Sequence, residues 1–238
     1  SDDWAALALN GPASRSILSL CTDVDLSNAA FPWLTAQELT VAGKRLWGFR
    51  MSYAGELGWE FHIPGDDALA VYDAVWRAGA DLGIADYGSF AMNVLRMEKA
   101  FKGAGELTNE VTLAEADVLR FARRDKDYLG RDRTWNQSTK KWVCAYLQIE
   151  PDGINDGHGG EAVLQNGKVI GATASVVFSH TVGKILAFAY LAPAANVPGS
   201  EIDVLIAGQT RKGRILADPV YDPDNKRPRV DALETVAQ

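Results

Sequence analysis

Apolar residues recur at helical spacing in three stretches of the first half of the chain. Ala13–Leu20 follows the Gly11-Pro12 pair, and Leu69–Gly79 repeats apolar residues every three or four positions. A third helix is expected from Phe90 to Phe101, where Gly103 and Gly105 would end it, because glycine readily takes left-handed dihedrals.

Strand patterns lie between the first two predicted helices. Arg45–Ser52 and Trp59–Ile63 alternate apolar with polar residues, and Glu38–Val41 does so weakly. Gly55 lies between the two stronger runs. The sequence therefore predicts a β-hairpin with a glycine turn.

The pattern changes after Gly130, where short strand-like runs alternate with Gly and Pro turns. This spacing predicts a small β-sandwich or barrel. We place the boundary near Asn136–Lys140 and expect an α+β part at 1–137 and an all-β part at 138–238. The polar tail from Asp222 onward is expected to be loosely held. The predicted strands are Val143–Ile149, Ala162–Leu164, Lys168–Ala172, Ile185–Leu191 and Ile202–Ile206.

Composition narrows the classes of partner. The net charge of -7 and the lack of a basic tract argue against nucleic acid. No apolar run reaches bilayer length, and the acidic first residues do not resemble a signal peptide. We expect a cytoplasmic or organelle-matrix protein that works on an organic ligand.

The cysteines and histidines do not suggest a metal site. Cys21 and Cys144 are far apart in sequence and are expected to be small core residues. The three histidines form no i,i+4 pair, so zinc or iron is not expected.

Glu56 is the first candidate for binding chemistry. A carboxylate on a glycine-flanked turn can accept two parallel N–H bonds, the pattern that a pterin edge or a guanidinium offers. The plain alternative is an exposed turn glutamate, and spacing alone favours it.

Two further segments could contribute. Arg96 is expected beside the buried stripe of its helix that includes Leu95, where it could clamp a carboxylate or orient Glu56; the alternative is a surface salt bridge along the helix. Gly171–Ser175 could allow close backbone approach, or could be an exposed hairpin loop.

Taken together, these segments resemble the aminomethyltransferase family, which includes the T-protein of glycine cleavage and the C-terminal part of FAD-dependent dimethylglycine and sarcosine dehydrogenases. The motifs occur in the family's order over most of the chain. They are Tyr53–Glu60, Leu95–Glu98, Asn109–Leu113, Lys126–Arg131 and Gly171–Tyr190. Leu113 stands where the family usually has proline.

The resemblance implies roles for particular residues. Glu56 matches the glutamate that binds the pterin ring, Arg96 matches an arginine that contacts folate or supports the site, and Tyr53 would line the same pocket. The family's proton-transferring aspartate lies in a long portion before the segment that matches Leu7–Pro12, and no residue here corresponds to it. The catalytic residue is therefore unassigned, and the chain is expected to work with a missing N-terminal region or a partner subunit.

The resemblance implies tetrahydrofolate-dependent one-carbon transfer from an amine-type donor, with FAD only where a flavin domain precedes the chain. Two alternatives remain, a non-catalytic folate-binding module of the same family and a plain interaction domain. A relative devoted to iron-sulfur cluster maintenance would carry a cysteine between Arg124 and Gly130, and this chain has none there.

Overall fold

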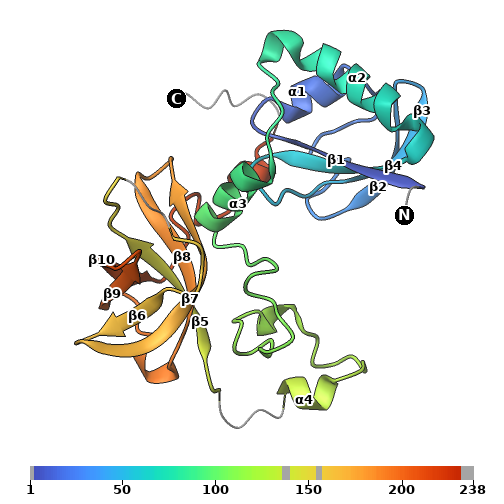
Figure 1. Ribbon diagram of the computed structural model, residues 1–238. Coiled ribbons are helices and arrows are strands. Elements are labelled where there is room, and N and C mark those ends of the chain that lie inside the picture. Colours follow the sequence, from blue (N-terminus) through green and yellow to red (C-terminus); the bar gives the residue numbers. More distant parts are fainter. Residues whose placement is uncertain (1–2, 136–139, 154–156, 232–238) are drawn as a thin grey trace. The chain divides into compact units, whose positions relative to one another are not determined.

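Residues 3–135, 140–153 and 157–231 are described by the computed structural model. The chain divides into two compact units, Ser1–Leu95 with Asp222–Gln238, and Arg96–Tyr221 (Figure 1). The strands are β1 Trp4–Asn10, β2 Ala36–Val41, β3 Lys44–Phe49, β4 Gly58–Pro64, β5 Val143–Ile149, β6 Ala162–Gln165, β7 Lys168–Ser179, β8 Lys184–Leu191, β9 Glu201–Ile206 and β10 Gln209–Leu216. The α-helices are α1 Ser14–Ser19, α2 Ala68–Gly79, α3 Ser89–Glu98 and α4 Arg131–Trp135.

The first unit is an antiparallel sheet of order β1-β4-β3-β2, with α1 and α2 packed on it (Figure 1). Ile17 and Leu18 of α1 and Val71 and Val75 of α2 share a buried cluster with apolar residues of the strands. Alternation explains this packing, because every second residue of a strand points to the same face. In β4, Trp59, Phe61 and Ile63 are buried while the residues between them are partly exposed.

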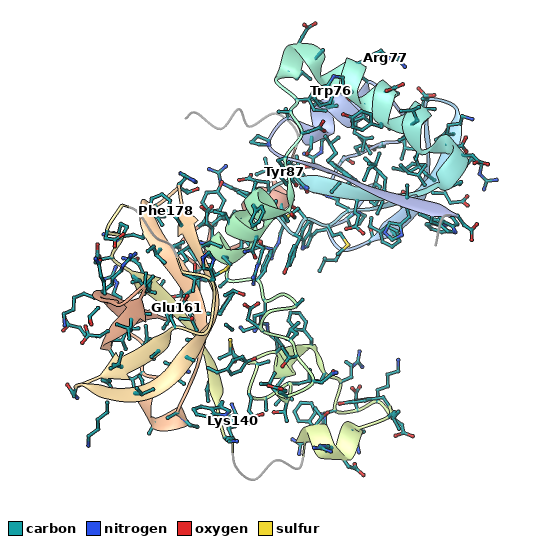
Figure 2. All side chains as sticks on the ribbon, in the orientation of Figure 1. Trp76, Arg77, Tyr87, Lys140, Glu161 and Phe178 are labelled. Carbon is teal, nitrogen blue, oxygen red and sulfur yellow. The ribbon has the colours of Figure 1, made fainter. Side chains whose placement is uncertain are left out.

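The second unit is built around a closed barrel of order β10-β5-β8-β7-β6-β9 (Figure 1). Its centre is filled by aliphatic side chains from all of these strands, including Leu147, Ala187 and Val204. Glu161, labelled in Figure 2, lies just ahead of β6. Its carboxylate accepts backbone N–H bonds from His158 and Gly159, which fixes the glycine-rich turn. The predicted α+β part followed by a β-barrel is confirmed.

Several local predictions were wrong. The β3–β4 hairpin exists, with Trp47 opposite His62, but a connection of residues 50–57 replaces the tight turn. Strands β1 and β10 were not predicted. For Gly171–Ser175, the alternative of an exposed hairpin loop was wrong, because the segment lies inside β7. The alternative of close backbone approach holds at Gly171, where a Cβ would come within 2.0 Å of the Tyr190 carbonyl on β8.

The end of α3 also differs from the prediction. The helix ends at Glu98, and Ala100 takes the left-handed conformation (φ 53°) that was expected of Gly103 or Gly105. The amides of Ala100 and Phe101 donate to the carbonyls of Met97 and Arg96, a Schellman arrangement. The last turn, rather than a stripe through Leu95, is the buried part of this helix.

The segment from Asp222 to Asp231 is folded rather than loosely held. Asp222 accepts the amides of Lys226 and Arg227, and Pro228 is buried within a short 3-10 turn, Arg227–Arg229. The proposed boundary at 136–140 falls mainly outside the described residues.

Candidate functional site

The loop joining β3 to β4 carries Tyr53 and Glu56. Gly55 has a φ of 78°, a left-handed conformation that glycine adopts without steric cost. Ala54 and Leu57 are both buried. Buried neighbours on both sides therefore fix the backbone at Gly55-Glu56.

The Glu56 carboxylate is mostly withdrawn from solvent. Its side chain is 18% exposed, and its Oε1 lies 3.6 Å from Nη1 of Arg227. Tyr53, in the same loop, is 42% exposed. The alternative of a freely exposed turn glutamate therefore does not describe Glu56. Such a loop offers an acceptor pair and an accessible aromatic ring to a flat heterocycle with N–H donors.

Two arginines lie at the Trp59 ring of the first unit. The guanidinium carbons of Arg50 and Arg15 are 5.7 Å and 5.8 Å from its centroid. Arg50 is fully buried and donates to the carbonyl of Phe31. Burial, and secondarily the nearby Arg15, lower the pKa of Arg50 to about 10, so it remains charged at neutral pH.

Arg96 lies in the second unit, in a buried ion pair. Its Nη1 is 2.7 Å from Oε2 of Glu106, and the two side chains are 5% and 0% exposed. Arg96 also donates to the Phe101 carbonyl and to Oγ of Ser175, and its guanidinium lies 5.7 Å from the Phe188 ring. A surface salt bridge along α3 is not what the structure shows.

The two predicted charged residues therefore belong to different units, and each has its own partner of opposite charge: Arg227 for Glu56 and Glu106 for Arg96. Sequence reasoning missed both partners. Glu106 follows Arg96 by ten positions in a glycine-containing segment, and no periodic pattern links them. Arg227 lies in a stretch that its polar composition marked as a tail.

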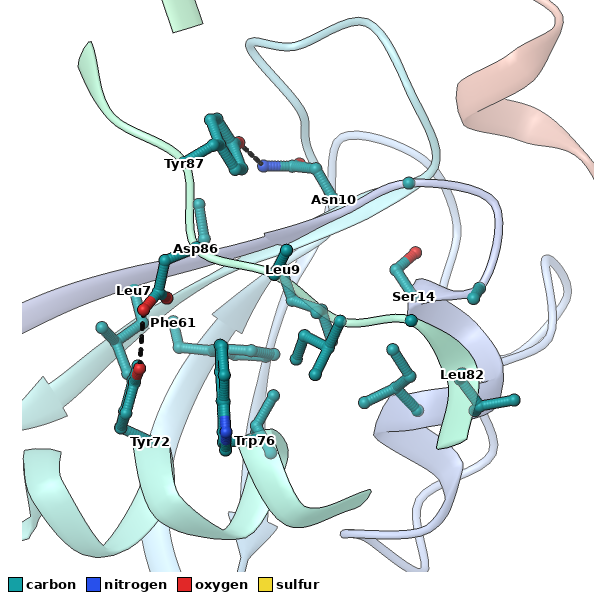
Figure 3. A pocket seen from close by; sticks show the side chains of 18 of the residues that line it. Leu7, Leu9, Asn10, Ser14, Phe61, Tyr72, Trp76, Leu82, Asp86 and Tyr87 are labelled. Carbon is teal, nitrogen blue, oxygen red and sulfur yellow. Dashed lines mark hydrogen bonds between the residues drawn. The ribbon is translucent and has the colours of Figure 1, made fainter. Parts of the chain in front are cut away.

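A cavity of about 680 Å³ opens in the first unit between β1, α1, α2 and the segment that follows α2. Tyr72 and Trp76 stack along one wall with ring centroids 5.8 Å apart. The Tyr72 hydroxyl donates to Asp86, and the Asn10 amide donates to the Tyr87 hydroxyl (Figure 3). The aromatic lining of this cavity suits a small, largely apolar group. Neither Tyr53 nor Glu56 is among its described lining residues.

Within the described ranges, no group of three or more His, Cys, Asp or Glu residues could hold a metal ion. Cys144 is buried, which raises the pKa of its thiol to about 12, and Cys21 packs against the core of the first unit. In the part of the chain that the structure describes, no helix has the length and apolarity needed to cross a membrane.

Two sequence models of one family match the chain. The GCVT N-terminal domain matches residues 1–126, and the glycine cleavage T-protein C-terminal barrel domain matches residues 140–222.

Curated relatives align over nearly the whole chain. Human mitochondrial dimethylglycine dehydrogenase is 33% identical over 97% of this chain and 27% of its own length. Mouse mitochondrial sarcosine dehydrogenase is 34% identical over 95% of this chain and 26% of its own length. An aminomethyltransferase of Koribacter versatilis is 32% identical over 96% of this chain and 60% of its own length. The chain thus spans about a quarter of the dehydrogenases and three fifths of the aminomethyltransferase.

A solved structure supports the fold. The glycine cleavage system aminomethyltransferase T of Bartonella henselae superposes with a TM-score of 0.75 at 21% identity, over 92% of this chain and 60% of that one. With more than half of the chain matched by the first sequence model, the chain belongs to the GCVT family, the family of the glycine cleavage T-protein.

Proposed function

We propose that this chain binds tetrahydrofolate through Glu56 and takes part in one-carbon transfer to it. The observation that carries the proposal is the mostly buried Glu56 carboxylate, fixed by Gly55 and placed 3.6 Å from Arg227. Family membership supports the choice of folate among ligands that carry parallel N–H donors.

The carboxylate fits the pterin ring chemically. The amide-amidine edge of the pterin presents two parallel N–H groups, and an ionised carboxylate can accept both. Because Glu56 is only 18% exposed, water competes less for these bonds than at an open turn. Tyr53 would supply an aromatic face to the same ring.

We assign Arg96 a supporting role. Its guanidinium is held by Glu106, Ser175 and the Phe101 carbonyl, so its position is fixed before any ligand arrives. Because the Arg96 side chain is only 5% exposed and is paired with Glu106, we propose that Arg96 supports the fold of the segment after α3 rather than contacting the folate itself.

The transfer itself needs alignment more than covalent help. Tetrahydrofolate supplies the nitrogens that take up the one-carbon unit, and the protein must hold them in line with the donor carbon and provide one proton acceptor. The relatives' names, dimethylglycine dehydrogenase, sarcosine dehydrogenase and aminomethyltransferase, point to a small N-methyl or aminomethyl amine as donor.

A demethylating reaction also needs a two-electron acceptor, because the N-methyl amine is oxidised before its carbon is transferred. We place a flavin in that role only where the complete protein contains a flavin-binding domain. A cytoplasmic location stays a prediction, which fractionation of the source cells would test.

The experiment is to measure binding of 5-formyltetrahydrofolate to the full-length gene product. Glu56→Gln should weaken binding about 10- to 100-fold, the effect of losing charge-assisted hydrogen bonds worth about 1.5–3 kcal/mol. Glu60→Gln is the matched control, since Glu60 belongs to the same motif but its carboxylate bonds to His62. Equal affinity of wild type and Glu56→Gln would refute the assignment.

Turnover assays separate the enzyme from a non-catalytic folate-binding module. The enzyme should form methylenetetrahydrofolate from an N-methyl or aminomethyl donor, and Glu56→Gln should lower kcat/KM for folate. A protein that binds folate without turning over any such donor would favour the module.

A further inference from the structure

The segment Asp222–Asp231, which we name the strap, folds back onto the first unit. Its turn is fixed by Asp222, whose carboxylate oxygens accept the amides of Lys226 at 2.9 Å and Arg227 at 3.1 Å. Asn225 takes a left-handed φ of 53° within this turn, a conformation that asparagine tolerates better than most residues. The strap therefore has a defined local shape.

Three consecutive backbone carbonyls of the strap accept hydrogen bonds from side chains of the first unit. Nη2 of Arg50 donates to the Pro228 carbonyl at 3.4 Å, Nδ2 of Asn28 to that of Arg229 at 2.8 Å, and Nη1 of Arg15 to that of Val230 at 2.8 Å. Arg50, Asn28 and Arg15 lie 178, 201 and 215 positions away from their respective acceptors in the sequence. Bonds of this kind recognise the backbone, so they fix where the strap lies whatever its side chains are.

The residue just before the clamped carbonyls is Arg227. Its Nη1 lies 3.6 Å from Oε1 of Glu56, and its side chain is 35% exposed. At this distance, longer than a direct hydrogen bond, the two opposite charges attract each other, and the attraction favours one placement of the partly buried Glu56 carboxylate. A carboxylate has about four lone-pair directions, so a cation on one side is compatible with ligand N–H groups on another.

We infer that Arg227 is a positioning residue for Glu56. The strap places the Arg227 guanidinium beside the loop and thereby fixes the position of the carboxylate that binds the pterin. This inference rests on the proposed function. It extends the site to a third segment of the chain and assigns the strap a role in substrate binding.

The test compares four single variants of the full-length gene product, with 5-formyltetrahydrofolate as the probe. Arg227→Gln should weaken binding about fivefold, the upper range for a partly exposed ion pair. Arg227→Lys should recover part of the affinity, because it keeps the charge but not the planar fork. Arg229→Gln is the matched control: it makes the same change two positions along, at an exposed residue, and should bind as wild type. Glu56→Gln supplies the reference.

A double-mutant cycle distinguishes positioning from a general structural effect. If Arg227 acts through Glu56, Arg227→Gln combined with Glu56→Gln should bind no more weakly than Glu56→Gln alone. Additive losses, or wild-type affinity in Arg227→Gln, would overturn the inference while leaving the proposed function intact. If wild type fails to bind, or Glu56→Gln binds as wild type, the proposed function fails and the positioning role falls with it.

Discussion

Replacing Glu106 with alanine should strongly destabilise the second unit. The Glu106 side chain is fully buried, and its Oε2 lies 2.7 Å from both Nη1 of Arg96 and the amide of Gly103. Its removal leaves a guanidinium that is 5% exposed without its carboxylate, and leaves a cavity behind. Breaking a buried ion pair in this way costs about 3–5 kcal/mol.

The expected loss is about 3–4 kcal/mol, at the lower end of that range, because Arg96 keeps its bonds to Phe101 and Ser175. For a protein of this size it corresponds to a fall in Tm of roughly 10 °C. Urea denaturation with an unchanged slope m would show that the change lies in stability rather than in the denatured state.

Two further variants test whether the predicted loss of stability comes from the unpaired guanidinium. Glu38→Ala removes an ion pair with Arg45 that is largely exposed and should cost less than about 1 kcal/mol. Arg96→Met combined with Glu106→Leu removes both charges and should recover much of the stability lost in Glu106→Ala. A loss below about 1 kcal/mol in Glu106→Ala would show that the pair contributes little, and that the unpaired guanidinium finds other partners.

Three further outcomes are expected. Ala100→Gly should raise the free energy of unfolding by up to about 1 kcal/mol, because glycine relieves the left-handed φ at the end of α3; an unchanged Tm would contradict this. Arg50→Ala should speed proteolytic cleavage within the strap, since Arg50 holds the Pro228 carbonyl; limited proteolysis with mass spectrometry would show it, and an unchanged cleavage rate would contradict it. Burial opposes ionisation of Glu115, but hydrogen bonds from Thr112, Lys141 and Trp142 outweigh burial and hold the pKa of Glu115 below the ordinary 4.5. The ionised carboxylate therefore stabilises the folded state above that pH, and this stabilisation is lost as the pH falls through the lowered pKa. Chemical denaturation across that range should show a weaker pH dependence in Glu115→Gln.

The barrel could be predicted from the sequence to the extent that its strands are apolar. β5 and β8 are long apolar runs, and turn residues bound them, so their extent was predicted closely. β10 was not predicted because its sequence, QTRKGRIL, is mostly polar. One of its inward positions is Arg211, whose side chain is buried. A polar strand is specified by the partners it pairs with, which no local window contains.

The candidate site, like the barrel, could be predicted only in part from the sequence. Gly55 and Glu56 form a local motif and could be recognised together, with the family resemblance supplying the ligand. Arg227, 171 positions after Glu56, is brought to it by bonds to backbone carbonyls, and such bonds leave no residue preference in the strap. The buried partner of Arg96 was missed for a related reason, because the loop from Gly103 to Glu106 has no periodicity from which its path could be read.

The return of the strap to the first unit bears on how the protein is made. Residues that complete this unit are synthesised after the whole barrel, since Arg96–Tyr221 separates the strap from the sheet it joins. During translation, the sheet and its two helices can assemble early, while the arginines that clamp the strap still face water. Arg227 reaches the Glu56 loop only when the strap has left the ribosome, so in a nascent chain stalled within β10 the Glu56 carboxylate should lack this ion pair.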